Sequence, residues 1–180
     1  MVRLFVAIDL PCEITEKFRS PQDALRKTRA RLSFVNPSII HLTLKFIGEV
    51  PDDRAAAIKD ALSRVSFPAF DLHVGCVSAN NPRQPRVIWS GITDDGKTVL
   101  LHGLVEDALA PLGIPRDDRP YRAHATLARV KRPDPSLAIC LKDMPKEEFG
   151  TCRVTSWKLK KSTLTPQGPL YETLLEVPCA

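Results

Sequence analysis

Two kinds of hydrophobic periodicity alternate along this chain, and they return in the same order in its second half. Continuous or alternating apolar runs predict β-strands over residues 4–8, 39–47, 70–77, 86–92, 121–130, 152–164 and 171–177. Helical spacing predicts helices over residues 13–31 with a break at Pro21, 54–65, 98–112 and, more briefly, 136–141. This mixture predicts an α+β protein.

One short phrase occurs once in each half. The sequence reads HLTL at 41–44 and HATL at 124–127, so both copies are His-x-Thr-Leu. Each copy follows a strand and a helix at nearly equal spacing, 41 − 4 = 37 residues after Leu4 and 124 − 88 = 36 residues after Ile88. The spacing indicates two lobes related by a pseudo-twofold axis, covering about 1–80 and 81–180 of a single domain, between which strands could be exchanged.

The repeated phrase has a simple geometric consequence if both copies are strands. Side chains at i and i+2 share one face, so His41 lies beside Thr43, and His124 lies beside Thr126. Two such strands facing one another would bring two imidazoles and two hydroxyls to one cleft. Lys45 has the same parity as His41, so we expect it to add positive charge there.

Two histidines across a cleft suit acid–base catalysis at phosphorus. An imidazole with a pKa near 6.5 can accept a proton and an imidazolium can donate one. Attack of water on a phosphodiester requires both transfers, and threonine hydroxyls can donate hydrogen bonds to the phosphate oxygens. This mechanism requires no metal, cofactor or covalent nucleophile.

A metal site is the alternative for the histidines, but neither motif has a cysteine or carboxylate at ligand spacing. We therefore expect no metal. His73 and His102 lack the repeated context, and we interpret both as structural or exposed.

Net charge and cysteine content add little to this interpretation of the sequence. The net charge of +5 favours an anionic partner such as nucleic acid without requiring one. Five cysteines without a Cys-x-x-Cys pair predict buried free thiols in a reducing compartment. The absence of a signal peptide and of an apolar run of roughly 18–20 residues predicts a cytoplasmic protein without a membrane segment. The oligomeric state stays open, with a monomer favoured.

Several ordered motifs carry a resemblance that covers almost the whole chain. They read RLFVAIDLP at 3–11, HLTLKFIGEV at 41–50, RVIWSG at 86–91 and HATLAR at 124–129, followed by the segment 162–171. The chain resembles the two-histidine (2H) phosphoesterase superfamily, and within it the LigT/ThpR-like RNA 2′,3′-cyclic phosphodiesterases. It departs from that pattern in having Ala123 before the second histidine, where proline is usual, and Phe34 where tryptophan is common.

The resemblance implies a bilobal fold in which two mostly antiparallel sheets flank a central cleft with helices outside. It implies hydrolysis of RNA 2′,3′-cyclic phosphate ends, tRNA halves among them, to 2′-phosphates. Ligation of such an end to a 5′-hydroxyl, giving a 2′-5′ linkage, is the related reaction. His41 would donate a proton to the leaving 3′ oxygen, His124 would accept one from water, and Thr43 and Thr126 would hold the phosphate.

Other candidates are secondary. Arg129 is typical of the family, but on a regular strand it points away from His124, so it reaches phosphate only if the strand twists or bulges; a structural ion pair is the alternative. Tyr121, Phe46 and Tyr171 could stack on a base, although core packing is the ordinary role of such residues.

Three further functions stay open at this level. The chain could be a phosphodiesterase for cyclic nucleotides, one for 2′-5′ oligonucleotides, or a non-catalytic RNA-binding module that keeps the fold.

Overall fold

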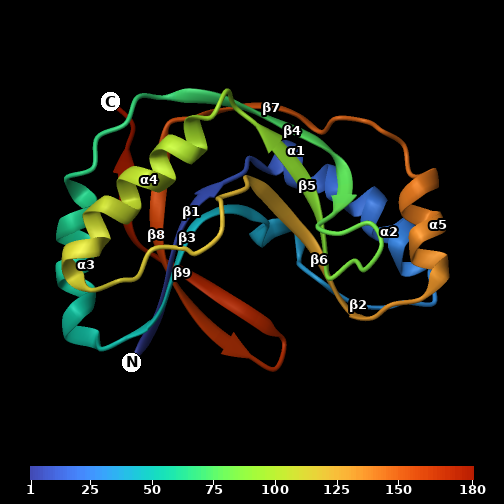
Figure 1. Cartoon of the computed structure of the whole chain (residues 1–180), viewed down its shortest axis with the longest axis horizontal. Helices are drawn as coiled ribbons and strands as arrows, with labels where there is room; N and C mark the ends of the chain where they lie inside the picture. Colours follow the sequence, from blue (N-terminus) through green and yellow to red (C-terminus); the bar gives the residue numbers. More distant parts are fainter.

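The computed structural model describes residues 1–180 and has the shape of an arch with two lobes (Figure 1). Nine antiparallel strands form one curled sheet in the order β7-β4-β5-β6-β3-β1-β8-β9, and β2 pairs with β6 beside this path. The strands are β1 (Val2–Asp9), β2 (Arg31–Phe34), β3 (His41–Val50), β4 (Phe70–Ala79), β5 (Val87–Thr93), β6 (His124–Arg132), β7 (Gly150–Val154), β8 (Ser156–Thr165) and β9 (Gly168–Pro178).

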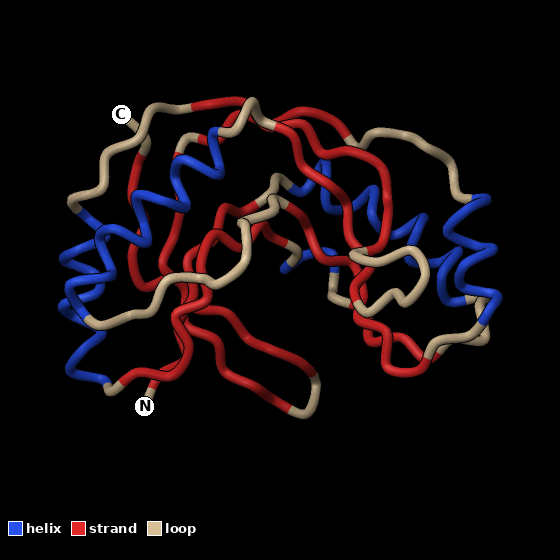
Figure 2. The backbone as a smooth tube through the Cα atoms, viewed as in Figure 1, coloured by secondary structure: helices blue, strands red, loops and turns tan.

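Helices cover the outer face of the sheet in each lobe (Figure 2). They are α1 (Cys12–Thr15), α2 (Arg19–Arg26), α3 (Asp52–Ser63), α4 (Lys97–Leu109) and α5 (Pro135–Asp143), with 3₁₀ turns at Glu16–Phe18, Pro37–Ile39 and Ala110–Leu112. A single cluster of 34 buried apolar residues runs through both lobes, so they share one core. None of these helices is long and apolar enough to cross a membrane.

The α+β fold with helices outside and strands around a central cleft is confirmed, with one refinement. The two predicted sheets are continuous with each other, because β3 and β6 meet at the single residue pair Leu42 and Ala125. Strand twist accumulated on either side of this narrow junction curls the sheet into the arch (Figure 1).

Elements cross between the two halves of the sequence. β2 comes from the first half but pairs with β6, and the ring of Phe18, just before α2, packs against Phe149 at 4.7 Å. The hairpin of β8 and β9 returns to pair with β1. The division near residue 80 stays a prediction for the limits of the two lobes.

Two predicted elements are wrong in detail. The helix predicted to reach residue 31 ends at Arg26, where the backbone N–H and hydroxyl of Thr28 both donate to Leu25 O, and Leu32 then pairs in β2. The strand predicted over 152–164 is two strands, because the chain leaves β4 at Val154 and joins β1 through β8. The cysteines are free as expected, but none is fully buried.

Candidate active site

The repeated phrases lie where β3 and β6 meet. Leu42 and Ala125 pair across the two strands, and both side chains are fully buried in the core. The residues beside them therefore face the opposite side of the sheet. Because the strands are antiparallel, His41 lies across from Thr126, and Thr43 lies across from His124. The fold thus brings the four predicted residues together on one face.

Each histidine ring is held in the same way. The Nδ1 atom of His41 lies 2.9 Å from Ile39 O, and that of His124 lies 2.7 Å from Arg122 O. A carbonyl oxygen can only accept, so Nδ1 carries the hydrogen in both rings. The Nε2 atom is then the nitrogen that can accept or donate a proton in the cleft.

Aromatic rings support both imidazoles. His41 packs against Phe5 with ring centroids 5.0 Å apart, and against the edge of Tyr171 at 5.3 Å. His124 packs against Trp89 at 4.4 Å. Each histidine is thus fixed by a carbonyl two residues earlier and by an aromatic ring from a neighbouring strand.

The surroundings keep both histidines neutral near pH 7. Burial lowers the pKa of His41, and the nearby Lys160 lowers it further, against the opposing effects of Ile39 O and Asp9. Burial likewise lowers the pKa of His124, and Arg129 adds to this effect. These cations destabilise the imidazolium, and they would be offset by an anionic phosphate.

Sequence reasoning missed Asp9, which lies beside His41, and the two lysines that pair with it. Asp9 pairs with His41 across β1 and β3, and its carboxylate contacts Lys160 at 2.5 Å and Lys158 at 3.1 Å. Burial alone would raise the pKa of Asp9, but the two ammonium groups bring it below its ordinary value. The signals were an aspartate closing an apolar strand and lysines alternating on a strand face.

Both histidine strands contain a bulge three residues after the histidine. In β3 the register passes from Ala7–Thr43 to Val6–Lys45, so Leu44 has no partner. The parity of the side chains changes at such a point. The prediction that Lys45 faces the cleft is therefore wrong, because Lys45 is buried behind the strand and is only 2% exposed.

The bulge in β6 has the opposite consequence. Its register with β5 passes from Trp89–Thr126 to Ile88–Ala128, which leaves Leu127 without a partner in β5. Leu127 and Ala128 are both buried, and Arg129 turns to the exposed histidine face. It lies near enough to lower the pKa of His124. This is the condition under which Arg129 was expected to reach a phosphate.

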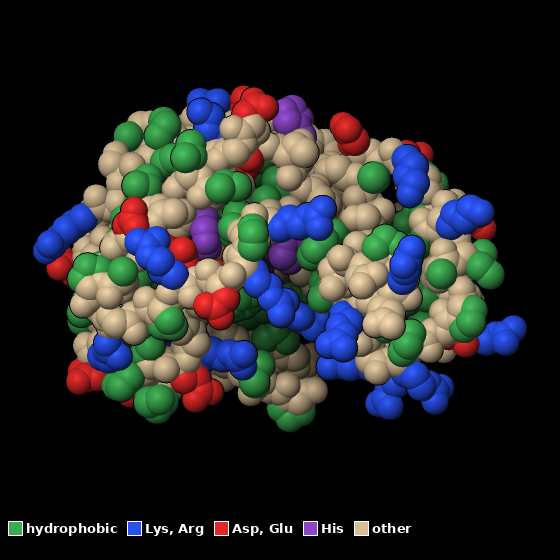
Figure 3. Space-filling model, viewed as in Figure 1, with side chains coloured by type: hydrophobic (Ala, Val, Ile, Leu, Met, Phe, Trp, Pro, Cys, Tyr) green, Lys and Arg blue, Asp and Glu red, His purple; other side chains and the backbone are tan.

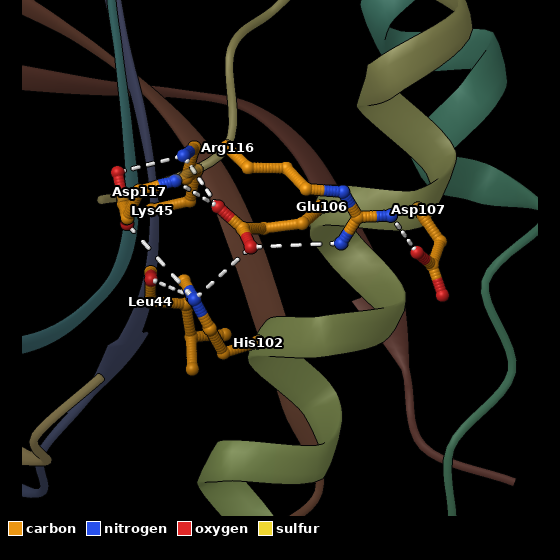
Figure 4. Close-up of polar contacts among 7 residues, drawn as sticks. All are labelled: Leu44, Lys45, His102, Glu106, Asp107, Arg116 and Asp117. Atoms are coloured by element: carbon orange, nitrogen blue, oxygen red, sulfur yellow. Dashed lines mark hydrogen bonds and ion pairs between the residues drawn. The ribbon is translucent and has the colours of Figure 1, made fainter. Parts of the chain in front are cut away.

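Lys45 is the centre of a buried ion-pair network on the far side of β3 (Figure 4). Its ammonium contacts Glu106 Oε1 at 2.6 Å and Asp117 Oδ1 at 2.7 Å. Burial alone would raise the pKa of Glu106, but Lys45 and the backbone N–H of Asp117 bring it below its ordinary value. His102, Glu106 and Asp117 have the composition of a metal site, but the Lys45 ammonium occupies the position between the carboxylates.

The aromatic candidates lie in three different environments. Tyr121 stacks on His102 in the buried network at 4.4 Å and donates its hydroxyl to Thr43 O at 3.1 Å. Tyr171 contacts His41, and Phe46 is 63% exposed. Tyr121 therefore supports the first motif from behind, while the other two lie where a base could reach them.

The family departures leave the histidines intact. Ala123, which replaces the usual proline, accepts a hydrogen bond at its carbonyl from Ile92 N–H and packs on the core. The ring of Phe34 lies under the guanidinium of Arg26 at 4.1 Å and faces α2 instead of the cleft.

The face that carries the site is hollowed and basic. Figure 3 shows Lys and Arg side chains gathered around a recess in the middle of the molecule, with histidine side chains at its edge. Such a surface attracts a phosphate-containing ligand.

Comparisons with known proteins agree with this geometry. The family described as LigT like Phosphoesterase matches residues 8–89 and 95–171. A curated relative from Archaeoglobus fulgidus, named RNA 2′,3′-cyclic phosphodiesterase, is 38% identical over 96% of this chain and 98% of its own length.

Solved structures agree as well. The crystal structure of Escherichia coli LigT complexed with 3′-AMP superposes with a TM-score of 0.83 at 26% identity, covering 99% of this chain and 98% of that one. The protein TT0787 of Thermus thermophilus gives a TM-score of 0.80 at 29% identity, covering 98% and 97%. With both histidine motifs inside the matched residues, the chain belongs to the LigT-like family of two-histidine phosphoesterases.

Proposed function

We propose that this protein hydrolyses RNA 2′,3′-cyclic phosphate ends to 2′-phosphates by two-histidine acid–base catalysis. The observation that carries the proposal is the matched pair of imidazoles, each with Nδ1 bonded to a carbonyl and Nε2 left for proton transfer. The curated relatives named RNA 2′,3′-cyclic phosphodiesterase support the choice of substrate. RNA, tRNA halves included, is the proposed partner, and a cytoplasmic monomer is the proposed state.

The reaction moves two protons around one phosphorus atom. His124 Nε2 accepts a proton from water as the water oxygen bonds to phosphorus. His41 Nε2 donates its proton to O3′ as the P–O3′ bond breaks, which leaves a 3′-hydroxyl and a 2′-phosphate. The assignment of donor and acceptor follows the family pattern, since the two environments are nearly symmetrical.

The neighbouring groups stabilise negative charge on the phosphate. Thr43 and Thr126 donate hydroxyl hydrogen bonds to the non-bridging oxygens, and Arg129 supplies positive charge from the same strand as His124. A 5′-hydroxyl of a second RNA in place of water would give a 2′-5′ linkage by the same proton transfers.

Product identification tests the proposal directly. A synthetic RNA with a 2′,3′-cyclic phosphate end should yield a 2′-phosphate, at the same rate with and without EDTA. A 3′-phosphate would overturn the assigned roles, and loss of activity with chelator would overturn the mechanism. Cleavage restricted to 3′,5′-cyclic mononucleotides or 2′-5′ oligonucleotides would identify a different phosphodiesterase. Unchanged function in His41→Ala and His124→Ala variants would identify a non-catalytic module.

The pH dependence follows from the two lowered pKa values. We expect kcat/KM to give a bell-shaped profile with its maximum below pH 6.5, the ordinary histidine value. One histidine must be protonated and the other neutral, so the productive fraction peaks between the two pKa values. The bound phosphate anion raises both values, so kcat should peak at higher pH than kcat/KM.

A charge variant checks the cause of this shift. Lys160→Met removes a cation beside His41 and should move one limb of the kcat/KM profile to higher pH. Lys146→Met, at an exposed position after α5, is the matched control and should leave both limbs unchanged. A flat profile from about pH 5 to 9 would contradict acid–base catalysis by the pair.

Exposed arginines on the paired strands β2 and β6 should bind the RNA chain beyond its reacting end. Arg31 in β2 pairs in register with Arg132 in β6, on the strand that carries Arg129. On single-stranded nucleic acid, each lost phosphate contact lowers the steepness of the plot of log binding constant against log salt concentration by roughly 0.7. Replacing both arginines by Ser should therefore lower this steepness by roughly 1.4.

The substrate comparison separates this role from catalysis. The Arg31→Ser, Arg132→Ser double variant should raise KM for an RNA oligonucleotide but leave hydrolysis of a 2′,3′-cyclic mononucleotide unchanged. Lys142→Ser with Lys146→Ser removes the same charge from exposed positions in and after α5 and serves as control. Equal effects of both double variants would show that net charge alone is responsible.

A further inference from the structure

Two backbone carbonyls belong to the residues that the bulges leave without a partner on the adjoining strand, β1 or β5. These are Leu44 O in β3 and Leu127 O in β6, each three residues after a catalytic histidine. Both lie in the core, where an unpaired carbonyl would be costly. Both are instead bonded by a side chain from a helix.

The donors come from equivalent helices of the two halves. His102 of α4 donates from Nδ1 to Leu44 O at 2.9 Å. Gln22 of α2 donates from Nε2 to Leu127 O at 3.0 Å, and also to Val35 O at 2.7 Å. In the first half α2 follows β1, and it reaches β6, the histidine strand of the second half. In the second half α4 follows β5, and it reaches β3, the histidine strand of the first half.

Both donor side chains are buried beside the carbonyls that they contact. Gln22 is 2% exposed and His102 is 7% exposed. His102 is further oriented by Glu106, whose Oε2 lies 3.5 Å from His102 Nε2 (Figure 4). Tyr121 stacks on the ring of His102. The backbone N–H of Val35 also donates to Leu127 O at 2.9 Å, so that bulge is held by two donors.

We propose that Gln22 and His102 are positioning residues that hold the two bulges, and through them the phosphate-binding side chains, in register with the catalytic histidines. The inference rests on the proposed function for its assay. Gln22 acts on the bulge that turns Arg129 to the histidine face. His102 acts on the bulge that directly follows Thr43, whose own carbonyl is held by Tyr121.

A shift of a bulge changes which side chains face the phosphate without removing any of them. If β6 returned to a regular register, Arg129 would point away from His124. A misplacement of about 1 Å in such a group can lower the rate by about a hundredfold. The two helices thereby couple the outer layer of each lobe to the site.

The test uses variants that remove the donor and keep the volume. Gln22→Met should lower kcat by about tenfold to a hundredfold, and Gln84→Met, in an exposed loop, should not. His102→Leu should lower kcat comparably, whereas His102→Gln keeps an N–H donor, as the other half does naturally, and should retain activity within about threefold. All rates are measured well below the unfolding temperature of the least stable variant.

A double-variant cycle separates positioning from loss of stability. Gln22→Met combined with Arg129→Met should be hardly slower than Arg129→Met alone, because Gln22 acts through Arg129. Independent, multiplying effects would overturn the proposal, as would full activity of Gln22→Met and His102→Leu. Failure of the wild-type protein to open a cyclic phosphate would instead overturn the proposed function.

Discussion

Replacing His124 by Asn should lower kcat for a 2′,3′-cyclic phosphate end by about a thousandfold, and replacing His41 by Asn should do the same. Asn keeps a side-chain N–H for the carbonyl that each Nδ1 contacts, but its amide group does not transfer a proton near neutral pH. Single-turnover hydrolysis of a labelled RNA measures the chemical step. His73→Asn, at an exposed histidine outside the site, should be fully active.

A modified leaving group distinguishes the two roles. If sulfur replaces O3′ in the cyclic end, the leaving thiolate needs no proton. The rate of His41→Asn should then approach that of the wild-type protein, while His124→Asn should stay slow. Rescue of His124→Asn instead would reverse the assignment, and a tenfold loss or less in both variants with the natural substrate would contradict the mechanism.

Replacing Lys45 by Met should lower the free energy of unfolding by about 3 kcal/mol, because it leaves Glu106 buried without its counter-ion. Asp117 reaches solvent and adds less to the loss. Denaturant unfolding at pH 7 measures the change. Adding Glu106→Gln should recover much of it, and Arg64→Met, which breaks an exposed pair with Asp60, should have little effect.

The pH dependence of this stabilisation has a definite sign. The pKa of Glu106 in the folded protein lies below its ordinary value of 4.5. The stabilisation is therefore complete above about pH 4.5 and is lost as the pH falls through the folded-state value. Lys45→Met should lose stability relative to the wild-type protein only above that range. The KM of the Lys45→Met variant for RNA should be unchanged at every salt concentration, because Lys45 lies behind β3.

The sequence alone predicted those features of the site that depend on local periodicity. Alternation in a strand places residues i and i+2 on one face, which was enough to put His41 beside Thr43 and His124 beside Thr126. Repetition of the phrase at matched spacing indicated that two such strands serve one site. Most strands and helices also follow from their own periodicity, because each buries one face in the core.

The parity of the residues beyond the bulges could not be predicted in this way. A bulge depends on how a strand pairs with its neighbour, and nothing in HLTLK or HATLAR shows that one residue will be left unpaired. Lys45 and Arg129 therefore exchange the faces that simple alternation assigns. The true setting of Lys45 also requires Glu106 and Asp117, which lie 61 and 72 residues away in sequence.

Long-range pairing decided the remaining features. Residues 31–34 form a strand only because β6 offers them an edge, and the chain divides at Thr155 because β7 and β8 pair with different strands. The sequence by itself determined that two His-x-Thr strands would present matched imidazoles and hydroxyls, since that follows from backbone geometry within four residues. Only the tertiary structure decided that these strands meet at Leu42 and Ala125, and that Arg129 and not Lys45 lies on the histidine face. It also decided that Gln22 and His102 donate hydrogen bonds to the bulge carbonyls, because each of these features depends on contacts between distant segments.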